Sequence, residues 1–200
     1  MKLIDIKTVY MCPDHNEKYH TRKLHMDKLL STIGFKDFTH YVSSTENYPT
    51  CLNMATIDIL EKNIDNPIII LEDDVEWTGI DEFVFEQTAD AIYFGLSRSG
   101  GHPTENIHLG DSVFEPWSDS QAKVLNILSG HAILYISREY KEAVFDILKK
   151  NVNTFYNDVL FARLQPNFLI LANKKPVFYQ SSKFNIGMHE ENWTKFELNI

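Results

Sequence analysis

The sequence predicts an α/β fold, in which one Rossmann-like domain has a mostly parallel central sheet flanked by helices. Short apolar runs alternate along the chain with longer stretches of helical periodicity, as they do where helices connect parallel strands. The 200 residues, 44% of them hydrophobic, are enough for one packed core and too few for two domains of ordinary size. We therefore expect residues 1–200 to form a single domain.

The first half of the chain has the clearer pattern. A first strand is expected over 3–11, and the following helix, over 17–33, ends at Gly34, a residue that favours the left-handed conformation after a helix. The run 68–71 is continuously apolar, as expected for a central strand buried on both faces. Between them we expect a strand over 38–42 and a helix from Thr50 that ends before Pro67.

The second half is predicted from weaker patterns. Apolar side chains recur at helical spacing over 138–150, which predicts an amphipathic helix. The segment 97–111 contains several glycines and a proline, and we expect a long loop there. The other expected elements are a strand over 91–96, strands or a bent strand pair over 124–128 and 132–136, a helix over 155–164, and short strands over 168–171 and 176–179.

Composition restricts the partners. The formal net charge of −9 would repel a nucleic-acid backbone, so no nucleic-acid partner is expected. No apolar stretch approaches the roughly 18 residues that span a bilayer, and the first residues lack the apolar core of a signal peptide. We therefore expect a soluble cytoplasmic protein without a transmembrane segment. Cys12 and Cys51 are interpreted as reduced thiols, because two cysteines make neither a disulfide framework nor a zinc site.

Three acids, Glu72, Asp73 and Asp74, follow the third predicted strand directly. Ligands of open α/β sheets bind at the carboxyl ends of the strands, and adjacent carboxylates repel one another unless a cation or solvent compensates them. Oxygen ligands favour Mg²⁺ or Mn²⁺, which would also let an acidic protein bind an anionic diphosphate. Glu72 and Asp74 are the predicted metal ligands, with Asp73 pointing the other way, toward a ribose or sugar hydroxyl. The alternative is a surface turn of solvated acids.

Other protein classes also carry acids after a strand. Haloacid-dehalogenase-type phosphatases and response regulators place theirs after the first strand, where this chain offers only Asp14. A metal-dependent phosphatase or nuclease is thus a more distant alternative.

Several segments, in order along the chain, form a larger pattern. Residues 50–75 place Cys-Leu-Asn-Met at a helix start and Ile-Ile-Ile-Leu-Glu-Asp-Asp-Val after the helix. This stretch resembles the core of the family 25 glycosyltransferases, which modify lipopolysaccharide and collagen. Further similar pieces are Thr8–Met11 followed by Arg22, Ser129–Ala132 with Tyr135–Ser137, Asn157–Leu160, and Pro176–Gln180. Cys-Leu-Asn-Met stands where Leu-Ser-His is more usual, and the tyrosine of an Ala-Tyr pair is displaced to Tyr135, which leaves the acceptor type open.

The resemblance implies a GT-A fold and a metal-dependent enzyme. Such an enzyme transfers a hexose or deoxyhexose from a nucleoside diphosphate sugar, with a UDP-sugar favoured, to a hydroxyl of a glycan or of a protein-linked acceptor. Glycosyltransferase domains that build chlorovirus capsid glycans are similar in size and fold, so a viral origin, with the host cytoplasm as location, is a further hypothesis. The alternative function is a catalytically silent carbohydrate-binding or assembly module of the same fold.

Two residues of the second half are candidates for the reaction itself. Asp158 is the candidate catalytic acid, either as a base on the acceptor hydroxyl or as a stabiliser of an oxocarbenium-like transition state. It could instead be a carboxylate that interacts with a helix N-terminus. His131 is expected to line the acceptor cleft, with a hydrogen-bonded core histidine as the alternative.

The remaining candidates come from the two ends of the chain. Cys12 and Arg22 are expected to contact the donor together with Asp73, because the loop after the first strand borders the nucleotide in the GT-A fold. A solvated helix residue is the alternative for Arg22. His189 is a candidate third metal ligand, since GT-A enzymes often bring a late histidine back to the metal. A solvated tail histidine is the alternative there.

Overall fold

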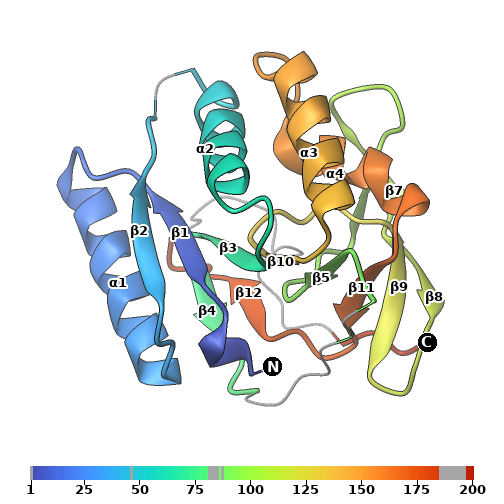
Figure 1. The fold of residues 1–200 in the computed structure, drawn as a ribbon, viewed down its shortest axis with the longest axis horizontal. Helices are drawn as coiled ribbons and strands as arrows, with labels where there is room; N and C mark the ends of the chain where they lie inside the picture. Colours follow the sequence, from blue (N-terminus) through green and yellow to red (C-terminus); the bar gives the residue numbers. More distant parts are fainter. Residues whose placement is uncertain (1, 46, 81–85, 87, 185–196) are drawn as a thin grey trace.

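The computed structural model describes residues 2–45, 47–80, 86, 88–184 and 197–200. Within these residues the α/β class is confirmed: an eight-stranded central sheet is flanked by helices (Figure 1). The sheet has the order β2-β1-β3-β10-β5-β11-β9-β8. Its strands are β1 (Thr8–Cys12), β2 (Phe38–Val42), β3 (Ile68–Glu72), β5 (Ala91–Tyr93), β8 (Val113–Pro116), β9 (Gln121–Asn126), β10 (Ala132–Tyr135) and β11 (Ile170–Asn173).

The sheet is mostly parallel in direction, with two reversals. The ladders show that β2, β1, β3, β5, β11 and β8 run one way, whereas β10 and β9 run the other way. Strand β10 lies between β3 and β5, with Ala132 opposite Leu71. Because this pairing is antiparallel, the segment that leads into β10 lies beside the carboxyl end of β3.

Helices and a small second sheet cover the two faces of the central sheet. One face packs against α2 (Thr50–Lys62), α3 (Arg138–Asn151) and α4 (Asn157–Leu164). The other face packs against α1 (Glu17–Ile33) and the pair formed by β4 (Val75–Trp77) and β12 (Phe178–Gln180). Alternate residues of β3 enter the two cores, which explains its continuous apolar run.

Local signals set the ends of two helices, including the expected end of α1 at Gly34. The Asn16 side chain accepts a hydrogen bond from the Tyr19 N–H at 3.2 Å, and Gly34 ends α1 with φ of 95°. The Ser137 hydroxyl accepts from the Tyr140 N–H at 3.1 Å at the start of α3. Two short 3₁₀ turns, Leu3–Asp5 and Gln165–Asn167, complete the helical segments of the described residues.

Several expected elements differ from the structure. The first strand begins at Thr8, because the chain before it forms a 3₁₀ turn. The expected loop over 97–111 contains a two-stranded sheet of β6 (Ser99–Gly101) and β7 (His108–Asp111). Strands β9 and β10 do not pair with each other, because β5 and β11 lie between them in the sheet. Strands β4 and β8 were not expected, because each is short and lacks a continuous apolar run.

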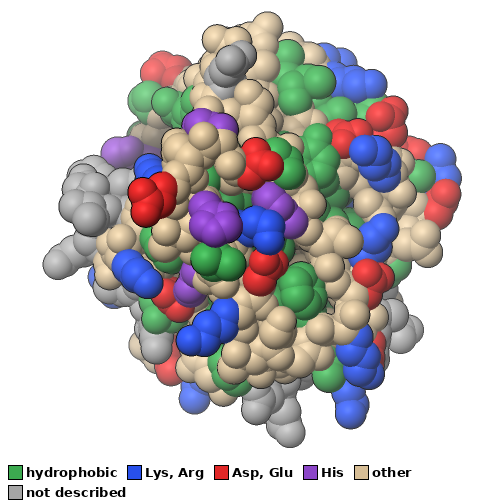
Figure 2. Space-filling view, turned by 90° about the vertical axis from the view of Figure 1, so that its left-hand side faces the viewer, with side chains coloured by type: hydrophobic (Ala, Val, Ile, Leu, Met, Phe, Trp, Pro, Cys, Tyr) green, Lys and Arg blue, Asp and Glu red, His purple; other side chains and the backbone are tan. Residues whose placement is uncertain are grey.

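The face formed by α1 and β2 carries interspersed charges of both signs, together with several histidines (Figure 2). No broad tract of one sign is visible among the described side chains on this face. Among the described helices, none is long and apolar enough to cross a membrane.

One buried lysine ties α3 to the end of α2. Lys141 is fully buried, and its ammonium donates to the carbonyl oxygens of Asn63, Ile64 and Asn66 at 3.0, 3.2 and 2.5 Å. These carbonyls follow the last turn of α2, and the Asn63 carbonyl also accepts from the Asn66 N–H at 3.3 Å. The ammonium therefore supplies the donors that the end of the helix needs.

We expect Lys141→Met to lower the free energy of unfolding by about 2 to 3 kcal/mol, because methionine fills the space but removes the three hydrogen bonds that the ammonium donates. Urea unfolding followed by circular dichroism measures the change. The matched control is Lys150→Met, an exposed lysine on the same helix, which should leave the midpoint unchanged. Equal midpoints for both variants would contradict this role for Lys141.

Candidate functional site

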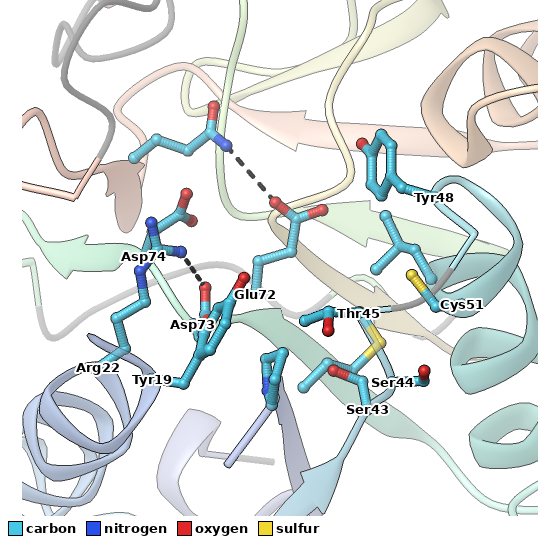
Figure 3. Close-up of a pocket in the computed structure, with 14 residues that line it drawn as sticks. Tyr19, Arg22, Ser43, Ser44, Thr45, Tyr48, Cys51, Glu72, Asp73 and Asp74 are labelled. Atoms are coloured by element: carbon cyan, nitrogen blue, oxygen red, sulfur yellow. Dashed lines mark hydrogen bonds and ion pairs between the residues drawn. The ribbon is translucent and has the colours of Figure 1, made fainter. Parts of the chain in front are cut away.

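Two cavities open at the carboxyl edge of the sheet. The first cavity, of about 410 Å³, lies between the end of β1, the start of α1, residues 43–45 after β2 and the start of α2. Figure 3 shows Glu72, Asp73 and Asp74 on one side of it, with Tyr48 and Cys51 on the other. The second cavity, of about 500 Å³, is lined by the segments 106–108, 128–131 and 156–159. Tyr48, Glu72 and Gln180 line both cavities, so the two meet at the end of β3.

Glu72, the last residue of β3, lies where the cavities meet. Its N–H donates to the His131 carbonyl at 2.9 Å, and its carboxylate accepts from the Gln180 amide at 3.4 Å. Gly130 stands beside it without a side chain, and a Cβ there would lie 3.2 Å from the Glu72 carboxylate. Burial, followed by the negative charges of Asp74, Asp158 and Asp73, raises the pKa of Glu72 well above its usual value. The carboxyl group is therefore in an environment that favours a proton or a cation.

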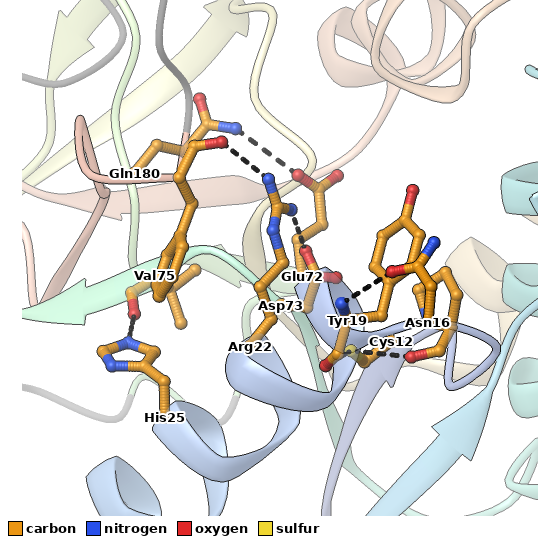
Figure 4. Close-up of polar contacts among 11 residues, drawn as sticks. Cys12, Asn16, Tyr19, Arg22, His25, Glu72, Asp73, Val75 and Gln180 are labelled. Atoms are coloured by element: carbon orange, nitrogen blue, oxygen red, sulfur yellow. Dashed lines mark hydrogen bonds and ion pairs between the residues drawn. The ribbon is translucent and has the colours of Figure 1, made fainter.

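Asp73 and Arg22 form a buried ion pair. The Arg22 guanidinium donates to the Asp73 carboxylate at 2.6 Å and to the Phe184 carbonyl at 2.7 Å (Figure 4). Asp73 was expected to point away from Glu72 and Asp74, but β3 ends at Glu72 and the chain turns there. The alternation of a strand therefore does not continue, and all three acids line the first cavity. Two of the three predicted donor-binding residues, Arg22 and Asp73, are thus brought together, and Arg22 matches the charge of Asp73.

Asp74 is buried and lines the first cavity with Glu72. Its carbonyl accepts from the Ser181 N–H at 2.7 Å, which fixes the turn to the chain after β12. The described residues contain no ready-made cluster of three His, Cys, Asp or Glu side chains for a metal. Two carboxylates are nevertheless a fitting set for Mg²⁺ or Mn²⁺, which commonly take one or two protein carboxylates plus phosphate and water oxygens. His189, the third candidate ligand, lies outside the described residues.

Asp158 lines the second cavity from the first turn of α4. Burial raises the pKa of Asp158, and hydrogen bonds from backbone N–H groups, including Val159 at 2.8 Å, oppose the shift. Asp158 therefore both interacts with the N-terminus of α4 and lines a cavity, as the two interpretations of this residue required. Asp158 and Glu72, which are 86 residues apart in the sequence, both line the second cavity.

His131 lines the second cavity and is only 2% exposed. Ser129 Oγ donates to the Gly95 carbonyl at 3.1 Å and contacts His131 Nδ1 at 3.2 Å, so Nδ1 carries the hydrogen of the second contact. The Nε2 atom has no hydrogen-bond partner among the described residues. A Cβ on Gly95 would lie 1.8 Å from this atom, so the imidazole occupies the space a side chain would need.

The sequence-based predictions and the structure disagree on three further residues near the site. Cys12 is fully buried, donates its thiol hydrogen to the Pro13 carbonyl, and lines neither cavity, whereas its neighbours Met11 and Pro13 line the first. Gln180 was not selected as a site residue, although it ends the Pro-x-x-x-Gln segment of the resemblance. Tyr48 was missed because no periodic pattern surrounds it.

The Arg22–Asp73 pair yields a stability prediction. Arg22→Met should lower the free energy of unfolding by about 3 kcal/mol, because it leaves a buried carboxylate without its cation. Adding Asp73→Asn should recover most of that loss, since an uncharged amide is cheaper to bury. Urea unfolding of both variants tests the coupling, and a loss that the second substitution does not recover would contradict it. Lys62→Met, which breaks the exposed pair with Asp58, is the control and should leave the midpoint unchanged.

His131 should make stability depend on pH. Burial lowers its pKa from the usual 6.5 to about 4, so the unfolded chain takes up a proton first as the pH falls. This contribution is complete above about pH 6.5 and is lost toward pH 4, by up to about 3 kcal/mol. His131→Asn lacks the titration, so the difference in unfolding free energy between the two proteins should shrink over this range. A difference that stays constant with pH would show that the imidazole is not held neutral.

No family model and no curated protein matches this chain, so the resemblance to family 25 stays a prediction. Solved structures do resemble it. A nucleoside-diphosphate-sugar pyrophosphorylase from Vibrio cholerae RC9 is 15% identical, with coverage of 82% of this chain and 70% of its own and a TM-score of 0.43.

Two further solved structures resemble the chain. A glycosyltransferase involved in glycosylation of the major capsid of PBCV-1 is 11% identical, with coverage of 84% and 81% and a TM-score of 0.48. The protein A197 from STIV is 16% identical, with coverage of 87% and 84% and a TM-score of 0.47. At these identities and TM-scores the similarity concerns the course of the chain and assigns no activity.

Proposed function

We propose that this protein is a metal-dependent glycosyltransferase. It moves a hexose or deoxyhexose from a nucleoside diphosphate sugar, preferably a UDP-sugar, to a hydroxyl of a glycan or of a protein-linked acceptor. The main support is the meeting of two cavities at Glu72. A group transfer needs two substrates whose reacting atoms come together at one point, and two adjoining cavities can hold them in that way.

The first cavity has the features that a nucleotide needs. The Tyr19 ring and the hydroxyl-bearing residues 43–45 line it, and such groups can contact a base and a ribose. Arg22 adds a cation to the wall, next to Asp73. Glu72 and Asp74 would hold Mn²⁺ or Mg²⁺, and the ion, when bound, would neutralise the diphosphate as it leaves. The carboxylates alone would repel that diphosphate.

The second cavity suits the acceptor. Asp158 would take the proton of the attacking hydroxyl in an inverting reaction, or stabilise positive charge on the sugar ring in a retaining one. Its raised pKa favours the first role, because a more basic carboxylate accepts a proton more readily. His131 stays neutral near pH 7, since burial lowers its pKa to about 4, and the residue lines this cavity.

Asp74→Asn tests the proposal, because the variant keeps the shape of the side chain and loses the charge that a hard cation requires. Titration calorimetry with Mn²⁺ plus UDP should show binding to the wild type and a loss of at least about tenfold in affinity in the variant. Stability should stay equal or rise, because one of several neighbouring negative charges is removed. Metal-dependent release of UDP from UDP-glucose or UDP-rhamnose should fall in parallel.

The matched control is Glu76→Gln, an acid two residues further along that lines neither cavity. Its affinity for Mn²⁺ plus UDP should equal that of the wild type. Equal affinity in Asp74→Asn would remove the metal from this cluster. If the wild type binds UDP but never releases it from a UDP-sugar, with or without metal, the silent binding module is the better description.

A further inference from the structure

Two tyrosines that line the second cavity, Tyr48 and Tyr156, are exposed. Tyr48 is 64% exposed and Tyr156 is 40% exposed, and their ring centroids lie 5.5 Å apart at 39°. Tyr48 lies just before α2 and Tyr156 just before α4, so the pair is formed by the fold rather than by local sequence. Aromatic rings gain free energy when they are covered, so two adjacent exposed rings on the rim of a cavity are a suitable surface for a ligand.

The backbone beneath these rings is tied down by hydrogen bonds. Thr50 Oγ1 donates to Asn153 Oδ1 at 3.0 Å, which joins the start of α2 to the connection between α3 and α4. The buried Asn53 amide donates to the Val152 and Phe155 carbonyls at 3.0 and 2.8 Å. A ligand that covers the rings therefore has little backbone to order, which lowers the entropic cost of binding.

The loop below Tyr156 is tied in the same way. The Tyr156 N–H donates to Asn106 Oδ1 at 2.9 Å, and Asn106 Nδ2 donates to the Thr154 carbonyl at 3.1 Å. Asn106 itself lines the second cavity. The rim that carries the two rings is thus continuous with the wall of the cavity.

The wall of the second cavity combines apolar side chains with acids and amides. The carboxylates of Glu72 and Asp158 and the amides of Asn157 and Gln180 line it. A carboxylate or an amide has two polar atoms in one plane, so each such group can bind two neighbouring hydroxyls of a sugar. The described residues that line the cavity include no lysine or arginine, so an anionic ligand would meet repulsion without a matching cation.

We propose that Tyr48 and Tyr156 form a stacking platform for a neutral pyranose, so that the acceptor is a saccharide bound by its ring. A pyranose presents C–H groups on a face and hydroxyls around its edge. The C–H face would cover the tyrosine rings, while edge hydroxyls reach the carboxylates and amides inside. The role as acceptor rests on the proposed glycosyltransferase function, whereas the binding of a neutral sugar does not.

Saturation-transfer NMR tests the platform on the protein without nucleotide or metal. The probes are methyl β-glucopyranoside, methyl α-mannopyranoside and methyl α-rhamnopyranoside, with glucuronate as the anionic counterpart. At least one of the neutral glycosides should receive saturation from the wild type, and glucuronate should receive much less. Tyr48→Ala and Tyr156→Ala should each weaken the binding by about tenfold, and Tyr48→Phe and Tyr156→Phe should retain it, because the ring face is kept.

The matched control is Trp117→Ala, which removes an aromatic ring of comparable exposure, 47%, that lines neither cavity. All of these variants should melt within about 2 °C of the wild type, because the rings are exposed. The platform is overturned if no neutral glycoside binds the wild type, if both alanine variants bind as well as it does, or if glucuronate binds equally well.

Nucleotide binding is measured separately by calorimetry with UDP and Mn²⁺. If the wild type binds UDP but none of the neutral glycosides, the platform alone is overturned. Sugar binding without any UDP binding would overturn the glycosyltransferase and leave the platform standing as a saccharide site.

Discussion

The accumulation of negative charge at the carboxyl end of β3 is the constraint on which the rest of this structure depends. Glu72, Asp73 and Asp74 are consecutive, and Asp158 adds its charge from α4. Arg22 matches Asp73 through a buried ion pair, which leaves the other carboxylates to oppose one another's ionisation. A protein keeps such an arrangement at a cost in stability, and sites that bind a cation or move a proton are where that cost has a use.

The topology of the sheet places these acids where the two cavities meet. Because β10 runs antiparallel to β3, the segment 129–131 lies beside Glu72 and forms part of the wall of the second cavity. Gly130 leaves room for the Glu72 carboxylate, and Gly95 leaves room for the His131 imidazole. Both close approaches depend on the absence of a side chain, so these glycines belong to the site without contributing a functional group.

Rigidity around the site comes from buried polar cross-links rather than from apolar packing alone. Lys141 joins α3 to the end of α2, and Asn53 joins α2 to the connection between α3 and α4. Each donates to backbone carbonyls in the segment that follows a helix. These hydrogen bonds fix the backbone next to Tyr48 and Tyr156, so the two exposed side chains extend from ordered backbone.

The sequence by itself determined what local physics controls. Asn16 and Gly34 set the ends of α1, the apolar run of β3 indicated a strand buried on both faces, and the acids after it indicated where ligands bind in such folds. Only the tertiary structure decided that β10 lies between β3 and β5 and that Arg22 pairs with Asp73. It also decided that Tyr48 lies beside Tyr156. Caps and strand burial arise between near neighbours in the chain, whereas these contacts join residues far apart in it, whose pairing depends on how the whole core packs.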